Sequence, residues 1–293
     1  MGLITNYDKL ESMPTKSTLL TPAEINKLKV KYKKYLSTVN NPYIDAFYRL
    51  PECTISIYTS GKVVIQGADI DFMGTNAKPS FTPHAGSDEV GTGDYFGPVV
   101  VAACYVDDEH YALIKDLGIQ DSKAIDDQMI QKLAPKLMEL LPYSVLIVQN
   151  TKYNQIQKAN NLNAIKAKLH NQAYKHLIAK LKFTPTLNVI DQFTPAMNYF
   201  KYLNDEHDVF KHLRFETKAE NKYLAVACAS IIARDRFLAV WKQMEEQYSF
   251  SFPKGSGALV DQAAQRFVDQ YGFEKLHEVA KLHFKNTQKM ERI

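Results

Sequence analysis

The chain has 293 residues, of which 45% are hydrophobic and 23% charged, which is ordinary for a globular protein with one large domain and a smaller one. No apolar run approaches the roughly 20 residues of a membrane span, and residues 1–14 lack the pattern of a signal peptide. The net charge of +4 is by itself a weak indication of an anionic partner.

The first predicted elements form a small α+β domain over residues 1–66. The segment Thr21–Glu24 is typical of a helix start, with threonine as N-cap, proline next and glutamate three residues after the cap. Two β-branched runs, Cys53–Tyr58 and Lys62–Gln66, flank a Ser-Gly pair and predict a β-hairpin. The stretch 1–20 shows no convincing opening strand.

The segment 67–83 carries Gly, Pro, Ser and Thr without apolar periodicity, so it is predicted to be a linker. Strands and helices then alternate through a second domain, residues 84–293. The predicted strands cover 99–106, 143–148, 187–191 and 210–217, and the predicted helices 126–141, 160–181 and 221–248. This alternation indicates an α/β domain with a central mixed sheet flanked by helices.

Basic residues are concentrated in two stretches. Residues 152–190 contain seven lysines and neither Asp nor Glu. Five lysines between residues 27 and 34 are interleaved with tyrosine. A run of charge is often only a solvated helix face, but two such stretches favour a phosphate-backbone partner.

Cysteines and histidines give no sign of a zinc site. The three cysteines, Cys53, Cys104 and Cys228, lie far apart in apolar surroundings, so we interpret them as buried, reduced residues of a cytoplasmic protein. The histidines, including His170 and His176, form no HExxH pattern and are interpreted as surface or half-buried residues.

Two adjacent carboxylates, Asp88 and Glu89, precede a Gly91-Thr92-Gly93 turn that leads into an apolar strand. Neighbouring side chains of a regular strand point to opposite faces. A glycine-rich break can re-aim them, so we expect both acids to reach one site. The segment is neither a Walker loop nor a complete dinucleotide fingerprint.

Further acids lie at other strand ends. Asp191 ends the strand 187–191, where open α/β sheets place ligands, and Glu220 lies at a strand–helix junction. Glu216 and Asp235 are additional candidates. Each has an ordinary alternative: Asp191 as a helix cap, Glu220 as a first-turn acid, and Asp235 in an ion pair with a neighbouring arginine.

Carboxylates gathered from several strand ends suit hard divalent cations such as Mg2+, which prefer oxygen ligands. Two such ions clamp the attacking water and the leaving oxygen in phosphodiester hydrolysis. The residues therefore indicate a metal-dependent nuclease.

The segment Gly86–Pro98 resembles the signature of the type 2 ribonuclease H family, particularly ribonuclease HIII. Asp121–Lys123, Asn163–Asn171, Val189–Phe193 and Glu216–Glu220 resemble further motifs of the family in order and spacing. The resemblance runs from about residue 84 to the C-terminus.

The resemblance implies a ribonuclease H-like fold preceded by a TATA-binding-protein-like substrate-binding domain. It implies that Asp88, Glu89 and Asp191 bind metal, with Glu220, or alternatively Asp235, as the fourth acid. The expected cofactors are two Mg2+ or Mn2+ ions per active site. The implied reaction is hydrolysis of the RNA strand of RNA–DNA hybrids, leaving 5′-phosphate and 3′-hydroxyl ends.

Substrate contacts are assigned by the same resemblance. The residues concerned are Gly91, Thr92, Gly93, Ser122, Lys123, Lys166 and Lys218. Ribonuclease HII enzymes have Gly-Arg-Gly where this chain has Thr92 between glycines, which favours ribonuclease HIII-like cutting of ribonucleotide runs. The alternatives are ribonuclease HII-like incision at single ribonucleotides and a non-catalytic nucleic-acid-binding protein. We expect a cytoplasmic monomer.

Overall fold

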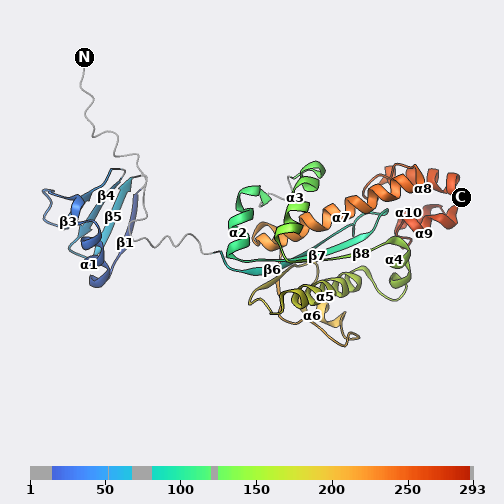
Figure 1. Ribbon diagram of the computed structural model, residues 1–293, viewed down its shortest axis with the longest axis horizontal. Coiled ribbons are helices and arrows are strands. Elements are labelled where there is room, and N and C mark those ends of the chain that lie inside the picture. The colour runs from blue at the N-terminus through green and yellow to red at the C-terminus, as the bar shows by residue number, and fades with distance from the viewer. Residues whose placement is uncertain (1–14, 52, 68–80, 120–124, 291–293) are drawn as a thin grey trace, which may run out of the picture. The chain divides into compact units, whose positions relative to one another are not determined.

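The computed structural model describes residues 15–51, 53–67, 81–119 and 125–290 (Figure 1). The chain divides into two compact units, Met1–Ser80 and Phe81–Ile293, each with a buried core of its own. The predicted linker 67–83 lies mostly outside the described residues.

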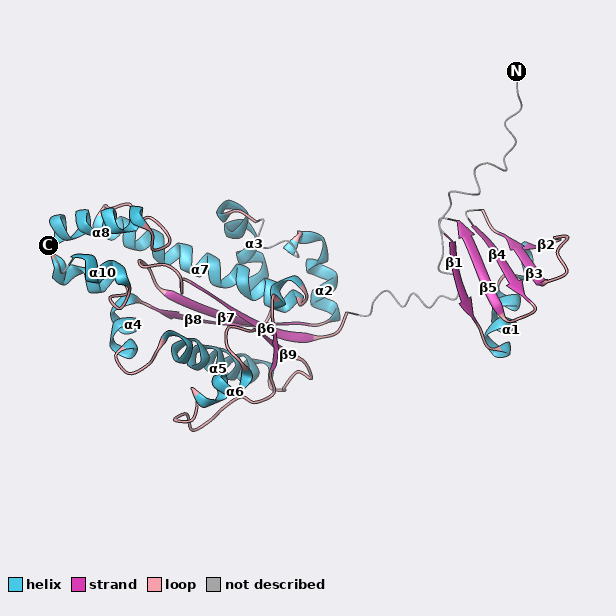
Figure 2. Cartoon of the chain, turned by 180° about the vertical axis from the view of Figure 1, so that it is seen from behind, coloured by secondary structure: helices cyan, strands magenta, loops and turns pink. Residues whose placement is uncertain are grey.

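The N-terminal unit is a five-stranded antiparallel sheet with the order β1-β5-β4-β3-β2, and helix α1 packs against one of its faces (Figure 2). Its elements are β1 (Thr15–Leu19), α1 (Pro22–Lys31), a 3-10 turn (Lys33–Tyr35), β2 (Leu36–Ser37), β3 (Ile44–Arg49), β4 (Cys53–Tyr58) and β5 (Lys62–Gly67). Alternate strand residues such as Tyr48, Ile55 and Ile65 form the core with Leu28 of α1.

Two predictions for this unit are confirmed and one is wrong. Thr21 and Glu24 form the reciprocal capping bonds at the start of α1, and β4 pairs with β5 as a hairpin. The expectation that residues 1–20 hold no strand is wrong, because β1 pairs with β5 along its whole length. Four of its five residues are exposed, so the backbone pairing defines this strand without apolar alternation.

The second unit is built on a mixed five-stranded sheet with the order β10-β9-β6-β7-β8. Its strands are β6 (His84–Val90), β7 (Val99–Val106), β8 (Tyr143–Val148), β9 (Asn188–Asp191) and β10 (Arg214–Glu216). Strand β6 is antiparallel to β7 and parallel to β9, which is in turn parallel to β10. Strand β7 is buried throughout, because helices cover both faces of the sheet.

Helix α7 lies on one face of this sheet and α5 on the other (Figure 1). The helices are α2 (Asp108–Ile114), α3 (Asp127–Leu140), α4 (Asn150–Gln157), α5 (Leu162–Leu181), α6 (Ala196–Lys201), α7 (Leu224–Tyr248), α8 (Ala258–Tyr271), α9 (Leu276–Val279) and α10 (Lys285–Met290). Short 3-10 turns cover Lys115–Leu117, Ala219–Asn221 and Phe273–Lys275. The predicted α/β architecture is confirmed.

The sequence missed β6, the strand that carries Asp88 and Glu89. Its residues lack apolar alternation, and it is a strand because three neighbours bury it: β7, β9 and α7. At Gly86 an added Cβ would lie 2.4 Å from the backbone nitrogen of Val226, so α7 packs directly on the strand backbone. The strand predicted over 210–217 is confined to Arg214–Glu216.

The three cysteines are free thiols in the cores of the two units, as predicted. Among the described helices, none is both long enough and apolar enough to cross a membrane.

Candidate active site

Parallel strand ends bring two acids side by side. Ser87 of β6 pairs with Ile190 of β9, so the next residues, Asp88 and Asp191, lie alongside each other where the pairing of these two strands ends. Carboxyl ends of parallel strands share one edge of a sheet, which is the usual place for a ligand in an α/β fold. We call Asp88, Glu89, Asp191 and Glu220 the acid cluster.

Asp88 and Glu89 keep the alternation of a regular strand. Asp88 accepts a hydrogen bond from Ser230 of α7, whereas Glu89 contacts α5 on the other side of the sheet. The expected re-aiming by the following glycines is therefore absent for this pair, because β6 stays paired with β7 through Val90. The two carboxylates therefore lie on opposite faces of β6.

Asp88 lies in surroundings that disfavour its charge. Burial, followed by repulsion from Glu89 and Asp191, raises the pKa of Asp88 from 3.8 to about 7, although Ser230 and the backbone N–H of Glu89 partly oppose the shift. A carboxylate placed at this cost beside other acids is an expected feature of a functional site.

Glu89 lies in surroundings that favour its charge. Burial alone would raise the pKa of Glu89, but its hydrogen bond and charge interaction with His170, together with Lys166, hold the pKa below its ordinary value. His170 lies 2.9 Å from Glu89 through Nε2, and Lys166 forms an ion pair with the same carboxylate. Glu89 is therefore held ionised.

A sharp turn places Glu220 next to Asp191. Lys218 adopts a left-handed conformation with φ 53°, which is unusual for a residue other than glycine. The turn directs the Ala219 N–H at Asp191, whose carboxylate accepts it at 2.9 Å. Glu220 follows in the 3-10 turn and is only 6% exposed.

The alternative fourth acid, Asp235, is bound to Arg236. The Arg236 Nε donates to the Asp235 carboxylate at 2.8 Å, within helix α7. Glu220 instead directly follows Ala219, whose N–H binds Asp191, so the geometry favours Glu220 as the fourth member.

The glycine turn beyond β6 has one buried glycine. An added Cβ at Gly91 would meet the Pro98 carbonyl at 2.1 Å, and the φ of 86° is itself one that glycine favours. Thr92 is partly exposed and Gly93 is exposed. Thr92 and Gly93 are therefore accessible from solvent, whereas Gly91 fixes the shape of the loop.

A buried lysine holds the far end of this loop. The Lys281 ammonium, 0% exposed, donates to the carbonyls of Asp94 at 2.8 Å and Gly97 at 2.6 Å. The Asp94 carboxylate in turn accepts the Gly255 N–H at 2.6 Å. Burial lowers the pKa of Lys281 to about 7. Sequence reasoning missed this residue, because a lone lysine near a C-terminus carries no local signal.

The remaining predicted substrate residues have different placements. Ser122 and Lys123 lie outside the described residues. Lys218 is exposed at the turn before Glu220, and Lys166 is buried against Glu89. The interpretation of His170 as a surface or half-buried residue is wrong, because its side chain is fully buried between β6 and α5. Its place four residues after Lys166 on a helix was the available signal.

The donor set of the acid cluster fits hard divalent cations, because it consists of carboxylate oxygens. A bound cation would offset the repulsion that Glu89 and Asp191 exert on the buried Asp88 carboxylate. As the side chains lie, no three acid, histidine or cysteine residues in the described part of the chain are arranged to hold an ion. Glu89 is turned toward Lys166 and His170.

We expect Asp88→Asn to flatten the pH dependence of stability in the presence of a chelator. A folded-state pKa of about 7, above the ordinary 3.8, means that Asp88 favours folding below about pH 4 and loses this contribution as the pH rises through 7. The loss is of the order of 4 kcal/mol at most. Urea denaturation in EDTA at about pH 5 and about pH 8 measures the part of this loss that falls between those two pH values. Parallel profiles for the two proteins would contradict the raised pKa.

Most of the second unit matches a known family. Residues 85–287 match the family described as Ribonuclease HII, and residues 18–73 match one described as a domain of unknown function. A Ribonuclease HIII of Streptococcus gordonii is 42% identical over 289 residues, covering 94% of this chain and 97% of that protein. A Ribonuclease HIII of Bacillus pumilus is 39% identical over 305 residues, covering 96% and 99%.

A solved structure is similar over both units. The crystal structure of Bst-RNase HIII in complex with Mn2+ aligns with a TM-score of 0.70 and 35% sequence identity. The alignment covers 95% of this chain and 98% of that one. The similarity therefore includes the N-terminal unit as well as the unit that carries the acid cluster.

Proposed function

Because the chain belongs to the ribonuclease HIII branch of the type 2 ribonuclease H family, we propose that its acid cluster cuts the RNA strand of RNA–DNA hybrids. The chain is thus a ribonuclease H, a metal-dependent endonuclease. The observation that supports this site is the juxtaposition of Asp88 and Asp191 on adjacent parallel strands, with Glu89 next to Asp88 in the chain and Glu220 next to Ala219, which binds Asp191.

The metal ligands we propose are the four members of the acid cluster, with two Mg2+ or Mn2+ ions per site. When bound, the ions supply the positive charge that activates water and stabilises the leaving 3′ oxygen, so the products carry 5′-phosphate and 3′-hydroxyl ends. The protein's own contribution is to hold the carboxylates at one strand end, with Ser230 orienting Asp88 and the Ala219 N–H orienting Asp191.

Recognition of RNA falls to the loop Gly91–Gly93. Its backbone groups are proposed to contact 2′-hydroxyls, the groups that distinguish RNA from DNA. Phe237 packs beneath Gly91 and Lys281 binds the loop's far end, so the loop is held in position before substrate arrives. Lys218 is proposed to contact phosphate, as are Ser122 and Lys123.

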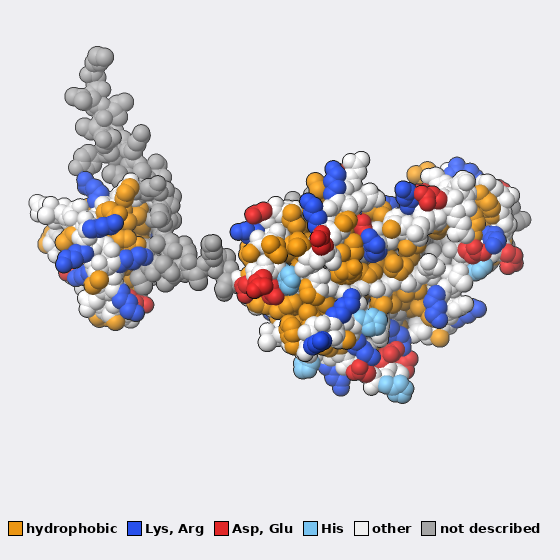
Figure 3. Space-filling model, viewed as in Figure 1, with side chains coloured by type: hydrophobic (Ala, Val, Ile, Leu, Met, Phe, Trp, Pro, Cys, Tyr) orange, Lys and Arg blue, Asp and Glu red, His pale blue; other side chains and the backbone are white. Residues whose placement is uncertain are grey.

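The N-terminal unit is proposed to bind the hybrid without taking part in the chemistry. Residues 15–67 contain eight Lys or Arg against three Asp or Glu. Blue side chains accordingly gather on the face of this unit seen in Figure 3. The sheet face opposite α1 carries Phe47 and Arg49, with the guanidinium 6.0 Å from the ring centroid. The excess of positive charge and the exposed Arg49 suit phosphate and sugar contacts.

The substrate preference is tested by comparing three duplexes that differ only in their ribonucleotides. We expect Mg2+- or Mn2+-dependent cutting of a hybrid or a duplex with four successive ribonucleotides, and weak cutting where one ribonucleotide stands alone. The expectation depends on Thr92, which takes the place of the arginine of ribonuclease HII. An all-RNA duplex is the control.

Two outcomes would overturn this proposal. Equal cutting at a single ribonucleotide would favour the ribonuclease HII-like alternative, and metal-independent binding without cutting would favour a non-catalytic binding protein. We further propose that the enzyme works in the cytoplasm as a monomer.

A further inference from the structure

Helix α5 presents two side chains to Glu89 from positions one helical turn apart. The Lys166 ammonium forms an ion pair with Oε1 of Glu89, and the His170 Nε2 lies 2.9 Å from Oε2. Both oxygens of this carboxylate are therefore engaged by the protein itself. Asp88, its neighbour in the chain, is instead repelled by two acids, Glu89 and Asp191.

His170 is oriented from its other side. Its Nδ1 lies 2.8 Å from the hydroxyl of Ser87, and both side chains are fully buried. A carboxylate only accepts hydrogen bonds, so the Nε2–H of His170 donates to Glu89, and Nδ1 pairs with the Ser87 hydroxyl. Ser87 and Glu89 lie on the same face of β6, and His170 joins them into one rigid unit.

Lys166 is held by an aromatic ring as well as by charge. Its ammonium lies 3.9 Å from the ring centroid of Phe193, and the same ring stacks on His170 at 5.5 Å. Lys166 is 7% exposed, a degree of burial that a lysine tolerates only when its charge is compensated. Phe193 follows Asp191 by two residues, so the contact is close to the acid cluster.

We propose that Lys166 is an internal counter-ion of the acid cluster, which competes with divalent metal for Glu89 while His170 keeps that carboxylate oriented. The inference rests on the proposed metal-binding role of Glu89. A cation that approaches Glu89 must displace or share the carboxylate oxygen now bound by Lys166, and like charges at this range repel strongly in a buried site. The face of Phe193 remains as a partner for the ammonium.

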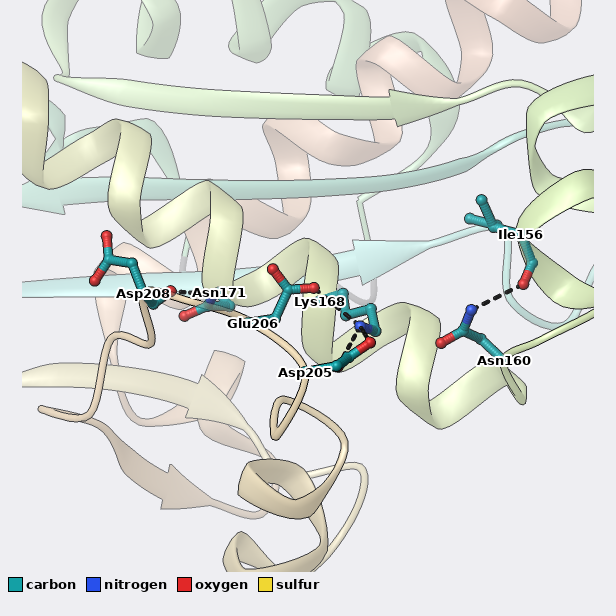
Figure 4. A network of polar contacts seen from close by, with 7 residues as sticks. All are labelled: Ile156, Asn160, Lys168, Asn171, Asp205, Glu206 and Asp208. Carbon is teal, nitrogen blue, oxygen red and sulfur yellow. Dashed lines mark hydrogen bonds and ion pairs between the residues drawn. The ribbon is translucent and has the colours of Figure 1, made fainter.

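This competition separates Lys166 from the other lysines of α5. Lys168 lies two residues further along the helix and binds Asp205 and Glu206 at 2.6 and 2.9 Å, as Figure 4 shows. Its partners belong to the loop after α6, which also contacts Asn171 through Asp208 (Figure 4). Lys168 is therefore a matched control, with the same charge on the same helix but with partners outside the acid cluster.

The experiment measures Mn2+ binding to the full chain without nucleic acid, by calorimetry and by the electron paramagnetic resonance signal of free Mn2+. We expect Lys166→Met to tighten Mn2+ binding about tenfold, a gain of roughly 1.4 kcal/mol. Methionine keeps an apolar stem against Phe193. Lys166→Arg should stay close to the wild type because it retains the charge, and Lys168→Met should change nothing.

His170 is tested in the same assay. We expect His170→Leu to weaken Mn2+ binding several-fold, on the order of 1 kcal/mol, and His170→Gln to restore most of the affinity, since its amide nitrogen replaces Nε2. Circular dichroism and thermal unfolding confirm that the variants are folded. Rescue by glutamine would not occur if the histidine only filled space.

Unchanged or weaker Mn2+ binding by folded Lys166→Met would overturn the counter-ion role, even if the wild type cuts hybrids normally. Wild-type protein that binds no Mn2+ would instead overturn the proposed metal ligands. The two failures are thereby distinguishable, because the first leaves the wild-type affinity intact.

Discussion

Replacing Asp88 with asparagine is expected to abolish cleavage while hybrid binding stays close to that of the wild type. Asparagine has the same size but lacks the charge that a divalent cation needs, so the rate should fall on the order of 10³-fold, which is about 4 kcal/mol of transition-state stabilisation. Single-turnover cleavage of a labelled hybrid with Mg2+ or Mn2+ measures the rate, and gel-shift or anisotropy titration with EDTA measures binding.

We expect the loss of cleavage in Asp88→Asn to occur in a folded protein. Asp88 is buried beside Glu89 and Asp191, which repel its charge, so the neutral asparagine is expected to stabilise the folded protein above about pH 7.

Asp235→Asn and Glu220→Gln form an informative pair of further variants. Glu220→Gln should lose activity as Asp88→Asn does, whereas Asp235→Asn should retain it, because Asp235 binds Arg236. Metal-dependent cleavage by Asp88→Asn at near wild-type rates would contradict the assigned site.

Deletion of residues 1–80 is expected to weaken hybrid binding and to make it less sensitive to salt. The deleted unit has eight Lys or Arg against three acids within residues 15–67, and a sheet face with Arg49 and Phe47 on it. Each phosphate no longer neutralised reduces the slope of log affinity against log salt by roughly 0.7–0.9. We expect the Michaelis constant to rise about tenfold or more, roughly 1.4 kcal/mol, with kcat little changed.

The catalytic unit has a core of its own, formed around β7 and α7, so the truncated protein should remain folded. Arg49→Gln in the full chain is the milder companion variant, since Arg49 is exposed and its loss disturbs no core residue. An unchanged Michaelis constant and salt slope after the deletion would show that the second unit binds the hybrid by itself. A fall in kcat at saturating hybrid would show instead that the N-terminal unit acts on the chemical step.

Some of the fold was accessible from local chemistry alone. The start of α1 was predicted because Thr21 and Glu24 cap each other within one turn, and the β4–β5 hairpin because its turn residues are local. The buried strand β7 was predicted from its continuous apolar residues. Helices α5 and α7 were predicted because each segment is long and contains no proline or glycine. Strand β1 was missed because its only support is pairing with β5, some 45 residues away in the chain.

The sequence by itself predicted the acids of the candidate site, Asp88, Glu89, Asp191 and Glu220, from the glycine turn after the first pair and from a strand end and a strand–helix junction for the others. It also determined the architecture, because the order of strands and helices leaves few arrangements of an α/β sheet. The partners of those acids were decided only by the tertiary structure. His170 and Lys166 reach Glu89 across some 80 residues of chain, and Ser230 reaches Asp88 across more than 140. Contacts between distant segments depend on how α5 and α7 pack on the two faces of β6, and no local pattern of residues encodes that packing.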